Sequence, residues 1–257
     1  YPCDLETLSH LAREAGDVPL IEDAAHAFPG CHAGRALGTW GVCGVYSFYA
    51  TKTITTGEGG MVVTDDDALA HRISVMRLHG IDREVWDRYT SAKPSWQYEV
   101  IEAGYKYNMP DLLAAIGRVQ LRKAERFQER RRGIARTYRR LLSERDYLTL
   151  PPWSDESSWH LFVVRLQLER LSIDRDEFIR RLAAEGVGTS VHYIPLHVMP
   201  YYRDRYGLKP DDFPVSWDAY LRAVSLPIYP GLRDEDAARV AEAVLRVGDA
   251  ARTRKHG

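Results

Sequence analysis

Short apolar runs that alternate with helical segments constrain the fold of this chain more than any other feature. The runs that we expect to be strands cover residues 18–21, 44–49 and 60–64. Apolar residues recur with helical period over 5–15, where Gly16 follows as a C-cap, and a second helix is expected over 68–78. Short strands that alternate with helices indicate an α/β fold with a sheet that is at least partly parallel.

The second half of the chain has a different texture. The pattern predicts one long helix over 111–142 with Asp111 as its N-cap. Beyond Pro151 and Pro152 the expected elements are strands over 160–166 and 187–193 and helices over 174–185, 217–223 and 234–247. Because this arrangement is typical of a smaller α+β unit, we expect two domains, residues 1–125 and 126–257.

Charge and cysteine content exclude several classes of partner. Lys and Arg number 35 and Asp and Glu 36, so the formal net charge is −1 and the molecule has no overall field that would attract nucleic acid or anionic lipid. The basic residues between 118 and 140 are interpreted as a solvated helix face. Three cysteines without CxxC spacing favour a reducing, cytoplasmic location.

The ends of the chain and its hydrophobic runs carry two further expectations. No apolar run approaches the roughly 18 residues of a membrane span, and no charged-then-apolar leader is expected. The first residue is Tyr1 rather than Met. We therefore expect the chain to be a piece of a longer protein.

Asp23 and His26 follow the first expected strand, in the sequence EDAAHA. Ligands of doubly wound sheets bind outside the carboxyl ends of the strands, so a carboxylate at this position points toward the binding crevice. A helix N-cap or a hydrogen-bonded loop aspartate is the competing interpretation of Asp23. For His26 the competing interpretation is a buried structural histidine.

Lys52 follows the second expected strand, five residues after Ser47, and precedes the glycine-rich turn 57–60. A lysine at a strand end beside small hydroxyl residues can attack a carbonyl carbon once its ammonium group loses a proton. A solvated surface lysine is the ordinary alternative. The turn is not a nucleotide-binding P-loop, because the chain contains no GxxxxGK[ST] sequence.

Taken together, Asp23, Ser47 and Lys52 are the groups that pyridoxal phosphate (PLP) needs. A lysine bonds covalently to the cofactor, and a carboxylate keeps the pyridine nitrogen protonated so that the ring can accept electrons. A serine hydroxyl can bind the phosphate group. The three residues therefore predict a PLP site at the carboxyl ends of two strands.

At this point the sequence resembles the DegT/DnrJ/EryC1/StrS family of PLP-dependent nucleotide-sugar aminotransferases. The resemblance extends over nearly the whole chain and is carried by IEDAAHA, SFYATKTITTGEGGMVVTDD, RLHGI, GYKYNMPDLLAAIGRVQL, HYIPLH and SLPIYPGLRDED. It implies fold type I, with an incomplete large domain built on a mostly parallel sheet and a smaller C-terminal α+β domain. It also implies an obligate homodimer.

The resemblance assigns roles to five positions. It implies that Lys52 bonds to the cofactor, that Asp23 faces the pyridine nitrogen, that His26 contacts the ring hydroxyl and that Ser47 binds the phosphate. It further implies that Asn108 reaches the phosphate of the cofactor bound in the neighbouring subunit. A turn or cap residue is the commoner interpretation of this asparagine. His192 and Tyr193 either line the sugar site or belong to the core of the small domain. We expect no metal site, because His160, His192 and His197 lack ligand spacing and an accompanying carboxylate.

One departure from the family pattern is large. Family members usually carry a long N-terminal part that includes the phosphate-binding loop and an aromatic residue that stacks on the ring, and we expect both to be missing from this chain.

The expected function is transfer of an amino group from glutamate to a nucleotide-linked keto sugar, for cell-surface polysaccharide synthesis. The sequences KYNM and HGIDREVWDRY resemble family members that aminate the sugar at C4, so we expect amination at this position. The alternatives are a catalytically incomplete fragment or non-enzymatic regulatory relative, and a PLP-dependent sugar dehydratase. In the dehydratases histidine replaces the lysine, so Lys52 favours an aminotransferase.

Overall fold

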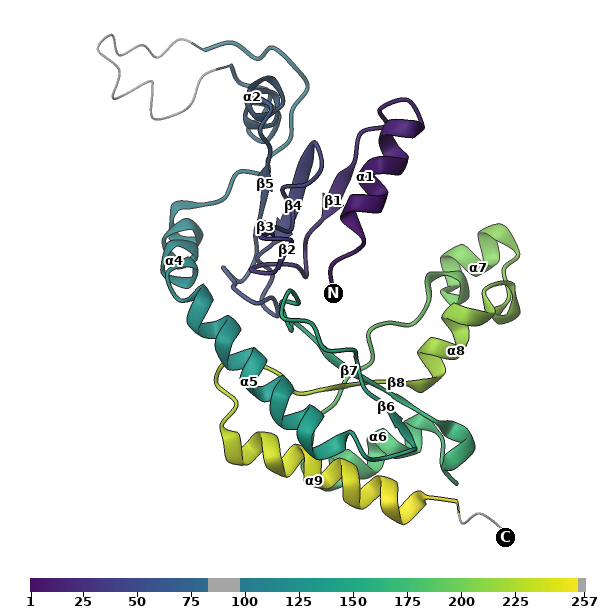
Figure 1. Ribbon diagram of the computed structural model, residues 1–257. Coiled ribbons are helices and arrows are strands. Elements are labelled where there is room, and N and C mark those ends of the chain that lie inside the picture. The colour runs from purple at the N-terminus through teal and green to yellow at the C-terminus, as the bar shows by residue number, and fades with distance from the viewer. Residues whose placement is uncertain (83–97, 254–257) are drawn as a thin grey trace. The chain divides into compact units, whose positions relative to one another are not determined.

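The computed structural model describes residues 1–82 and 98–253 of the chain (Figure 1). These residues form two compact units. Unit 1 consists of Tyr1–Glu125 together with Glu156–Ser158, and unit 2 consists of Arg126–Asp155 together with Trp159–Gly257. The aromatic residues of the sequence stretch 83–97 and the final four residues lie outside the described part of the chain.

Unit 1 combines helices with two small sheets. Its elements are α1 (Leu5–Glu14), β1 (Ile21–Asp23), β2 (Cys31–His32), β3 (Arg35–Ala36), β4 (Cys43–Ser47), β5 (Gly60–Val63), α2 (Asp67–Met76) and α4 (Asp111–Leu121). Helix α1 lies alongside β1 (Figure 1). Asp4 caps α1 by accepting a hydrogen bond from the amide of Thr7 at 3.0 Å, and Gly16 follows the helix with a φ of +93°.

The main sheet of unit 1 is mixed rather than mostly parallel. In the strand order β1-β4-β5, β1 pairs parallel with β4 in a register that sets Asp23 beside Val45. Strand β5 pairs antiparallel with β4, so that Ser47 lies beside Gly60. The expectation of a mostly parallel sheet is wrong for these strands, because the connection over 48–59 contains no crossover helix and the chain returns directly along β4.

Strand β1 differs from the predicted strand in position and in burial. The sequence predicts a buried strand over 18–21, whereas β1 begins at Ile21 and continues to Asp23. The amide of Val18 donates to the carbonyl of Ala12 at 3.0 Å, so Val18 belongs to the turn after α1. Ile21 is 68% exposed, and within the described residues β1 has a neighbouring strand on one edge alone.

The predicted long helix over 111–142 is two helices. Helix α4 ends at Leu121, and α5 (Ala124–Leu142) begins three residues later. At the break the amide of Lys123 donates to the carbonyl of Gln120 at 2.9 Å. This hydrogen bond reaches back three residues, as in a 3-10 turn, rather than the four residues of an α-helix. The N-cap is Pro110 rather than Asp111, and Asp111 lies in the first turn of α4. The positive end of the helix dipole stabilises a carboxylate at that position.

Unit 2 is an antiparallel sheet with helices. Its elements are α5, β6 (Leu148–Thr149), β7 (Phe162–Leu166), α6 (Arg175–Ala184), α7 (Pro200–Tyr206), α8 (Pro214–Arg222), β8 (Ala223–Leu226) and α9 (Asp234–Ala251), with short 3-10 helices at Leu168–Arg170, Leu196–Val198 and Pro210–Asp212. The strand order is β6-β7-β8, and both pairs are antiparallel. None of the helices in the described part of the chain is both long and apolar enough to span a membrane.

The strand predicted over 187–193 is absent from the described structure. Its single pairing is between Ser190 and Ser225, whose amides and carbonyls exchange hydrogen bonds of 3.2 and 2.8 Å. Strand β8, a fully buried four-residue strand directly after α8, pairs with β7 and also carries Ser225, the partner of Ser190. A run of four residues after a helical pattern is too short for sequence periodicity to reveal.

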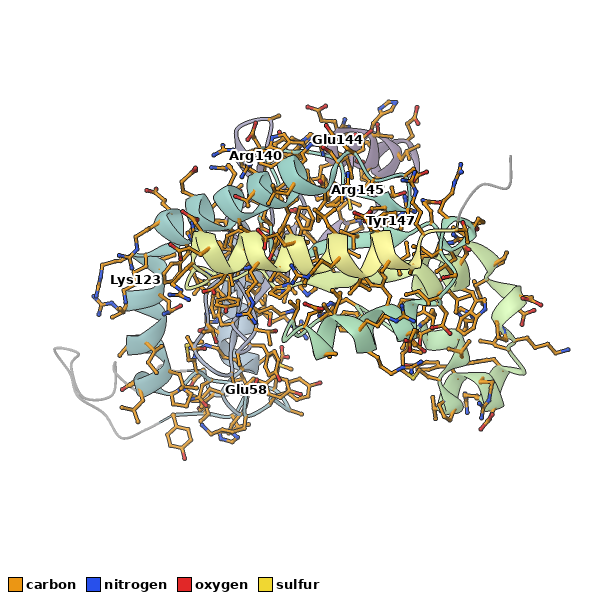
Figure 2. The ribbon with its side chains drawn as sticks, turned by 90° about the horizontal axis from the view of Figure 1, so that it is seen from below. Glu58, Lys123, Arg140, Glu144, Arg145 and Tyr147 are labelled. Carbon is orange, nitrogen blue, oxygen red and sulfur yellow. The ribbon has the colours of Figure 1, made fainter. Side chains whose placement is uncertain are left out.

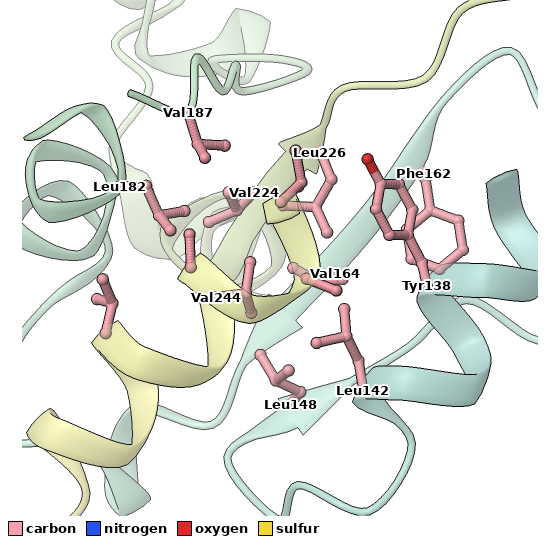
Figure 3. Close-up of a cluster of buried hydrophobic side chains, with 14 of the residues drawn as sticks. Tyr138, Leu142, Leu148, Phe162, Val164, Leu182, Val187, Val224, Leu226 and Val244 are labelled. Atoms are coloured by element: carbon pink, nitrogen blue, oxygen red, sulfur yellow. The ribbon is translucent and has the colours of Figure 1, made fainter. Parts of the chain in front are cut away.

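The hydrophobic core of unit 2 lies between the sheet and its helices (Figure 3). Helices α5, α6 and α9 contribute Leu142, Leu182 and Val244, and β7 and β8 contribute Val164 and Val224. All five side chains are fully buried. Tyr147 and Arg145 lie alongside α9 (Figure 2), where the Tyr147 hydroxyl donates to Asp249 at 2.9 Å.

Arg131 of α5 is a buried charge that ties the segments before β7 and after β8 to this helix. It is 4% exposed, and its Nη1 donates to the carbonyls of Ile228 at 2.9 Å and of Trp159 and His160 at 3.3 Å. Burial lowers the pKa of its guanidinium group to about 10. Three carbonyl acceptors therefore compensate for the desolvation of one cation.

Candidate active site

Asp23 and Ser47 lie at the carboxyl ends of neighbouring parallel strands. Asp23 is the last residue of β1, and Ser47 is the last residue of β4. The pairing of the strands continues beyond Asp23, where the amide of Ala24 donates to the carbonyl of Val45 at 2.9 Å. Parallel pairing is what brings these two strand ends to the same edge of the sheet.

The Asp23 side chain also shapes its own loop. Its Oδ1 accepts a hydrogen bond from the amide of Ala25 at 3.1 Å, and the residue is exposed. The hydrogen-bonded loop aspartate proposed as the competing interpretation is thus present in the structure. It does not exclude a binding role, because a carboxylate has further lone pairs that accept hydrogen bonds.

Lys52 lies in a turn directly beyond β4. The turn closes through a hydrogen bond of 3.0 Å from the amide of Lys52 to the carbonyl of Tyr49. The Thr55 hydroxyl supports the same loop, since it donates to the carbonyl of Phe48 at 3.0 Å and accepts from the amide of Gly57 at 2.8 Å. The threonines of the sequence ATKTITTGEGG therefore shape the loop that carries the lysine.

The electrostatics of Lys52 and Asp23 are coupled. Lys52 is half-buried, and desolvation lowers the pKa of its ammonium group below the ordinary value, while the charge of Asp23 acts in the opposite direction and raises this pKa. The two predicted residues therefore share one edge of the sheet, close enough for one charge to influence the other. A lysine with a lowered pKa is easier to deprotonate and hence a better nucleophile.

Ser47 lies beside this pair. Its Oγ accepts a hydrogen bond from the amide of Tyr49 at 3.3 Å, and the side chain is partly exposed. The hydroxyl is thereby oriented by the start of the Lys52 turn. The structure places Asp23, Ser47 and Lys52 on one pair of strands and the loops that follow them.

His26 lies in the loop after β1, and hydrogen bonds hold this loop at several points. The amide of Ala27 donates to the carbonyl of Ala24 at 2.9 Å. The hydroxyl of Thr53, the residue after Lys52, donates to the carbonyl of Phe28 at 2.6 Å. The loop that carries His26 is thus bonded directly to the loop that carries Lys52.

Asn108 lies in a different environment. Its Oδ1 accepts a hydrogen bond from the ammonium group of Lys106. The rings of Tyr105 and Tyr107, the sequence neighbours of Lys106, stack on each other with centroids 4.9 Å apart. Asn108 lines a concavity of about 870 Å³ formed by β5, α2 and α4 with residues such as Arg77, and this lining includes none of the other four predicted site residues. The described contacts of unit 1 do not bring Asn108 to Lys52.

His192 and Tyr193, which the sequence places either in the sugar site or in the small-domain core, lie in unit 2. His192 Nδ1 is 2.7 Å from the Ser225 hydroxyl, while the Tyr193 side chain is 64% exposed. These two neighbours therefore have different surroundings, since the histidine is anchored to β8 and the tyrosine faces solvent.

Sequence analysis missed Glu22, the residue before Asp23. Its carboxylate accepts hydrogen bonds from the amides of Gly38 at 2.7 Å, Gly41 at 2.8 Å and Trp40. Its side chain therefore fixes the glycine-containing loop 38–41 to the end of β1. The signal in the sequence was an acidic residue on a strand together with Gly38 and Gly41 in LGTWG, a loop whose amides need an acceptor.

Comparison with known proteins decides the family. The sequence profile of the DegT/DnrJ/EryC1/StrS aminotransferase family matches residues 1–245. This chain belongs to the DegT/DnrJ/EryC1/StrS family. It is 45% identical over 249 residues to the uncharacterized protein MJ1066 of Methanocaldococcus jannaschii, covering 96% of this chain and 64% of that protein. It is 42% identical over 245 residues to the spore coat polysaccharide biosynthesis protein SpsC of Bacillus subtilis, covering 94% and 62%.

Solved structures of DegT/DnrJ/EryC1/StrS relatives share the fold. PseC of Helicobacter pylori, an aminotransferase involved in the biosynthesis of pseudoaminic acid, superposes with a TM-score of 0.87 at 26% identity, covering 97% of this chain and 64% of that chain. The aminotransferase TlmJ of Streptoalloteichus hindustanus gives a TM-score of 0.82 at 37% identity, covering 97% and 63%. The chain thus has a mixed α/β structure of the fold type I aminotransferases and spans less than two thirds of the length of these relatives.

Proposed function

We propose that this chain carries the lysine site of a PLP-dependent aminotransferase that acts on a nucleotide-linked keto sugar. The observation that carries the proposal is the electrostatic coupling of Lys52 and Asp23 at the carboxyl ends of β1 and β4. A lysine whose pKa is lowered by burial, with a carboxylate on the same sheet edge, is the combination that covalent catalysis with PLP requires.

The residues present fit the cofactor. Lys52 would hold it through Nζ, and the anionic carboxylate of Asp23 would pair with the protonated ring nitrogen. The oriented hydroxyl of Ser47 would donate to the phosphate, and the imidazole of His26 would contact the ring hydroxyl. When bound, PLP supplies an electron sink that stabilises negative charge on the substrate carbon.

The catalytic work of this chain falls on the Lys52 amine. Once neutral, Nζ would take the proton from the α-carbon of the amino donor and deliver it to the cofactor carbon within the same half of the transfer, and the same shift would run in reverse when the sugar is aminated. Burial of the side chain supports this role because it favours the neutral amine. The carboxylate of Asp23 would contribute by pairing with the ring nitrogen and favouring its protonated form.

The proposal includes a homodimer in which Asn108 binds the cofactor phosphate of the neighbouring subunit. Two observations support it. Asn108 lines a surface apart from Lys52, as a residue that serves another subunit would. Helix α4, which follows Asn108, also exposes large apolar side chains, including Leu112 at 80%, Ile116 at 47% and Leu121 at 56%, which is typical of an interaction surface.

The substrate proposal is an amination at C4 of a nucleotide-linked keto sugar with glutamate as the donor, in cytoplasmic synthesis of a cell-surface polysaccharide. Its support comes from relatives, one named for spore coat polysaccharide biosynthesis and another for pseudoaminic acid biosynthesis. The sequence HGIDREVWDRY, residues 79–89, favours C4. Its part from residue 83 on lies outside the described residues.

A catalytically incomplete or regulatory chain is the alternative; the chain covers 62–64% of the two curated relatives named above. The two functions make different predictions for the purified chain with added PLP. An active lysine site gives a visible absorption band that borohydride bleaches, with the reduced pyridoxyl group on Lys52 by mass spectrometry. Lys52→Ala lacks the band, and Lys123→Ala, which removes a lysine at the junction of α4 and α5, retains it.

Adding glutamate and a UDP- or dTDP-linked keto sugar then tests transfer. Formation of 2-oxoglutarate and an amino sugar supports the aminotransferase, and a dehydrated sugar without 2-oxoglutarate supports a dehydratase. A chain that labels on Lys52 but releases no 2-oxoglutarate favours the regulatory alternative. Equal, weak binding of PLP by the wild-type chain and Lys52→Ala would refute the proposed lysine site.

A further inference from the structure

Residues 156–158, which we call the crossing segment, belong to unit 1 although the residues on either side belong to unit 2. Ser157 and Ser158 are buried, at 4% and 5% exposure. A short segment that belongs to unit 1 while its sequence neighbours belong to unit 2 must make specific contacts within unit 1. Those contacts are made with the loop 24–33 that carries His26.

At one end of this loop Glu156 makes a pair of hydrogen bonds. Its Oε2 lies 2.9 Å from His32 Nδ1, and its Oε1 accepts from the amide of Ala33 at 2.9 Å. The hydrogen bond between the two side chains raises the pKa of the His32 imidazole and lowers the pKa of the Glu156 carboxyl. Ala33 has a φ of +47°, an uncommon conformation for a residue with a side chain, and the carboxylate helps to hold it.

At the other end of the loop Ser158 contacts the candidate site residue itself. Its hydroxyl donates to the carbonyl of His26 at 2.5 Å. Between these contacts the backbone of Glu156 approaches Gly30 so closely that an added Cβ would lie 2.7 Å from the Glu156 carbonyl oxygen. The crossing segment therefore follows the loop from His26 to Ala33.

We infer that Ser158 and Glu156 are positioning residues for His26 in the cofactor site, an inference that rests on the proposed function. The loop is held on one side by Thr53, next to Lys52, and on the other by the crossing segment. If the bond from Ser158 is removed, the peptide group of His26 loses a fixed donor and the imidazole samples more positions. A side chain must be held within about 0.5 Å to keep its contact with a ligand.

The chain supplies a matched control for Ser158. The hydroxyl of Ser172, in unit 2, donates to the carbonyl of Ala251 at 3.0 Å. Ser172→Ala and Ser158→Ala therefore remove the same kind of hydrogen bond. A general effect of losing one serine-to-carbonyl bond appears in both variants, while a positioning effect appears in Ser158→Ala alone.

The experiment measures PLP binding to the full chain by absorbance titration over a pH series. Hydrogen exchange of the peptide that covers 24–33 is measured without PLP. Ser158→Ala is expected to weaken PLP binding about fivefold, the loss of one hydrogen bond, to shift the pH dependence of the cofactor absorption band and to speed exchange in 24–33. Glu156→Gln is expected to weaken binding in the same direction, Ser158→Thr to restore it, and Ser172→Ala to match the wild type.

The outcomes separate this inference from the proposed function. If the wild-type chain forms no borohydride-sensitive band, the proposed function fails and the positioning role with it. If the wild type binds PLP and Ser158→Ala binds with the same affinity and pH dependence, the inference alone is wrong. Faster exchange in 24–33 with unchanged PLP binding also overturns it, because the crossing segment would then support the loop without positioning His26.

Discussion

The charge of Asp23 raises the pKa of Lys52 while burial lowers it, and burial is the larger of the two effects. Asp23 ends β1, and Lys52 lies in the turn that follows β4, the parallel neighbour of β1. The lysine is partly removed from water by its own turn, and the carboxylate that would stabilise its charged form stays exposed at the end of β1. The arrangement lowers the pKa of the lysine and leaves the carboxylate exposed to solvent.

Removing the charge of Asp23 should lower the pKa of Lys52 further. In Asp23→Asn the attraction that stabilises the ammonium group is lost while the burial of Lys52 remains. The pKa can be measured by NMR titration of ¹³C-methylated lysines, with the Lys52 signal assigned by its absence in Lys52→Ala. Asp65→Asn, which neutralises an exposed aspartate after β5, should leave this pKa unchanged, and an unchanged pKa in Asp23→Asn would contradict the coupling.

The pair of His32 and Glu156 should stabilise the fold most in a window of mildly acidic pH. The pKa of His32 is raised above 6.5, so its contribution is complete below 6.5 and is lost as the pH rises through the folded-state value. The pKa of Glu156 is lowered below 4.5, so its contribution is complete above 4.5 and is lost as the pH falls through the folded-state value. Asp4 and Glu6 on α1 also raise the pKa of His32.

Thermal unfolding of the wild type and His32→Gln tests this window. The difference in Tm between the two should be larger at about pH 5.5 than at about pH 8, where the imidazole carries less of its charge. His10→Gln, which removes an exposed histidine paired with Glu14 within α1, serves as the control. A Tm difference that grows toward alkaline pH would have the wrong sign for a histidine with a raised pKa.

Two helical glycines of unit 2 should respond oppositely to alanine. A Cβ at Gly248 in α9 would lie 2.2 Å from the ring of Tyr147, whereas a Cβ at Gly133 in α5 would meet nothing within 4 Å. Gly248→Ala should lower the free energy of unfolding by about 1–3 kcal/mol through overpacking. Gly133→Ala should raise it by about 0.5–1 kcal/mol because alanine favours the helix.

Urea denaturation followed by circular dichroism measures both glycine variants. Combining Gly248→Ala with Tyr147→Leu removes the ring that the new methyl group meets, and the double variant should lose less than the sum of the two single changes. Strict additivity would show that Tyr147 is not the cause.

Glu22→Ala should destabilise unit 1 through the loop 38–41. Three backbone amides lose their acceptor, and buried donors without a partner cost about 1–3 kcal/mol each when water does not reach them. We expect a loss of at least about 2 kcal/mol in the free energy of unfolding and faster hydrogen exchange at Gly38 and Gly41. Glu58→Ala, at an exposed glutamate of the Lys52 loop labelled in Figure 2, should change neither quantity.

Local patterns were sufficient for several elements. The helices α1, α2, α6 and α9 follow the predicted periodicity closely, because their apolar stripes and their caps, such as Asp4 and Asp174, are written in consecutive residues. The break between α4 and α5 was not predictable from the apolar pattern, which continues through it. The short strands of unit 2 were hidden for a related reason, since two to four residues carry too little periodicity.

The sequence by itself determined the family and the order in which Asp23, Ser47 and Lys52 follow two short apolar runs, because motif spacing is a local property of the chain. The tertiary structure alone decided that the sheet is mixed, that Glu22 binds the loop 38–41 and that residues 156–158 hold the loop of His26. Each of these depends on contacts between residues far apart in the sequence, and such contacts are fixed by backbone hydrogen-bonding geometry and packing, which no local pattern of residue types records.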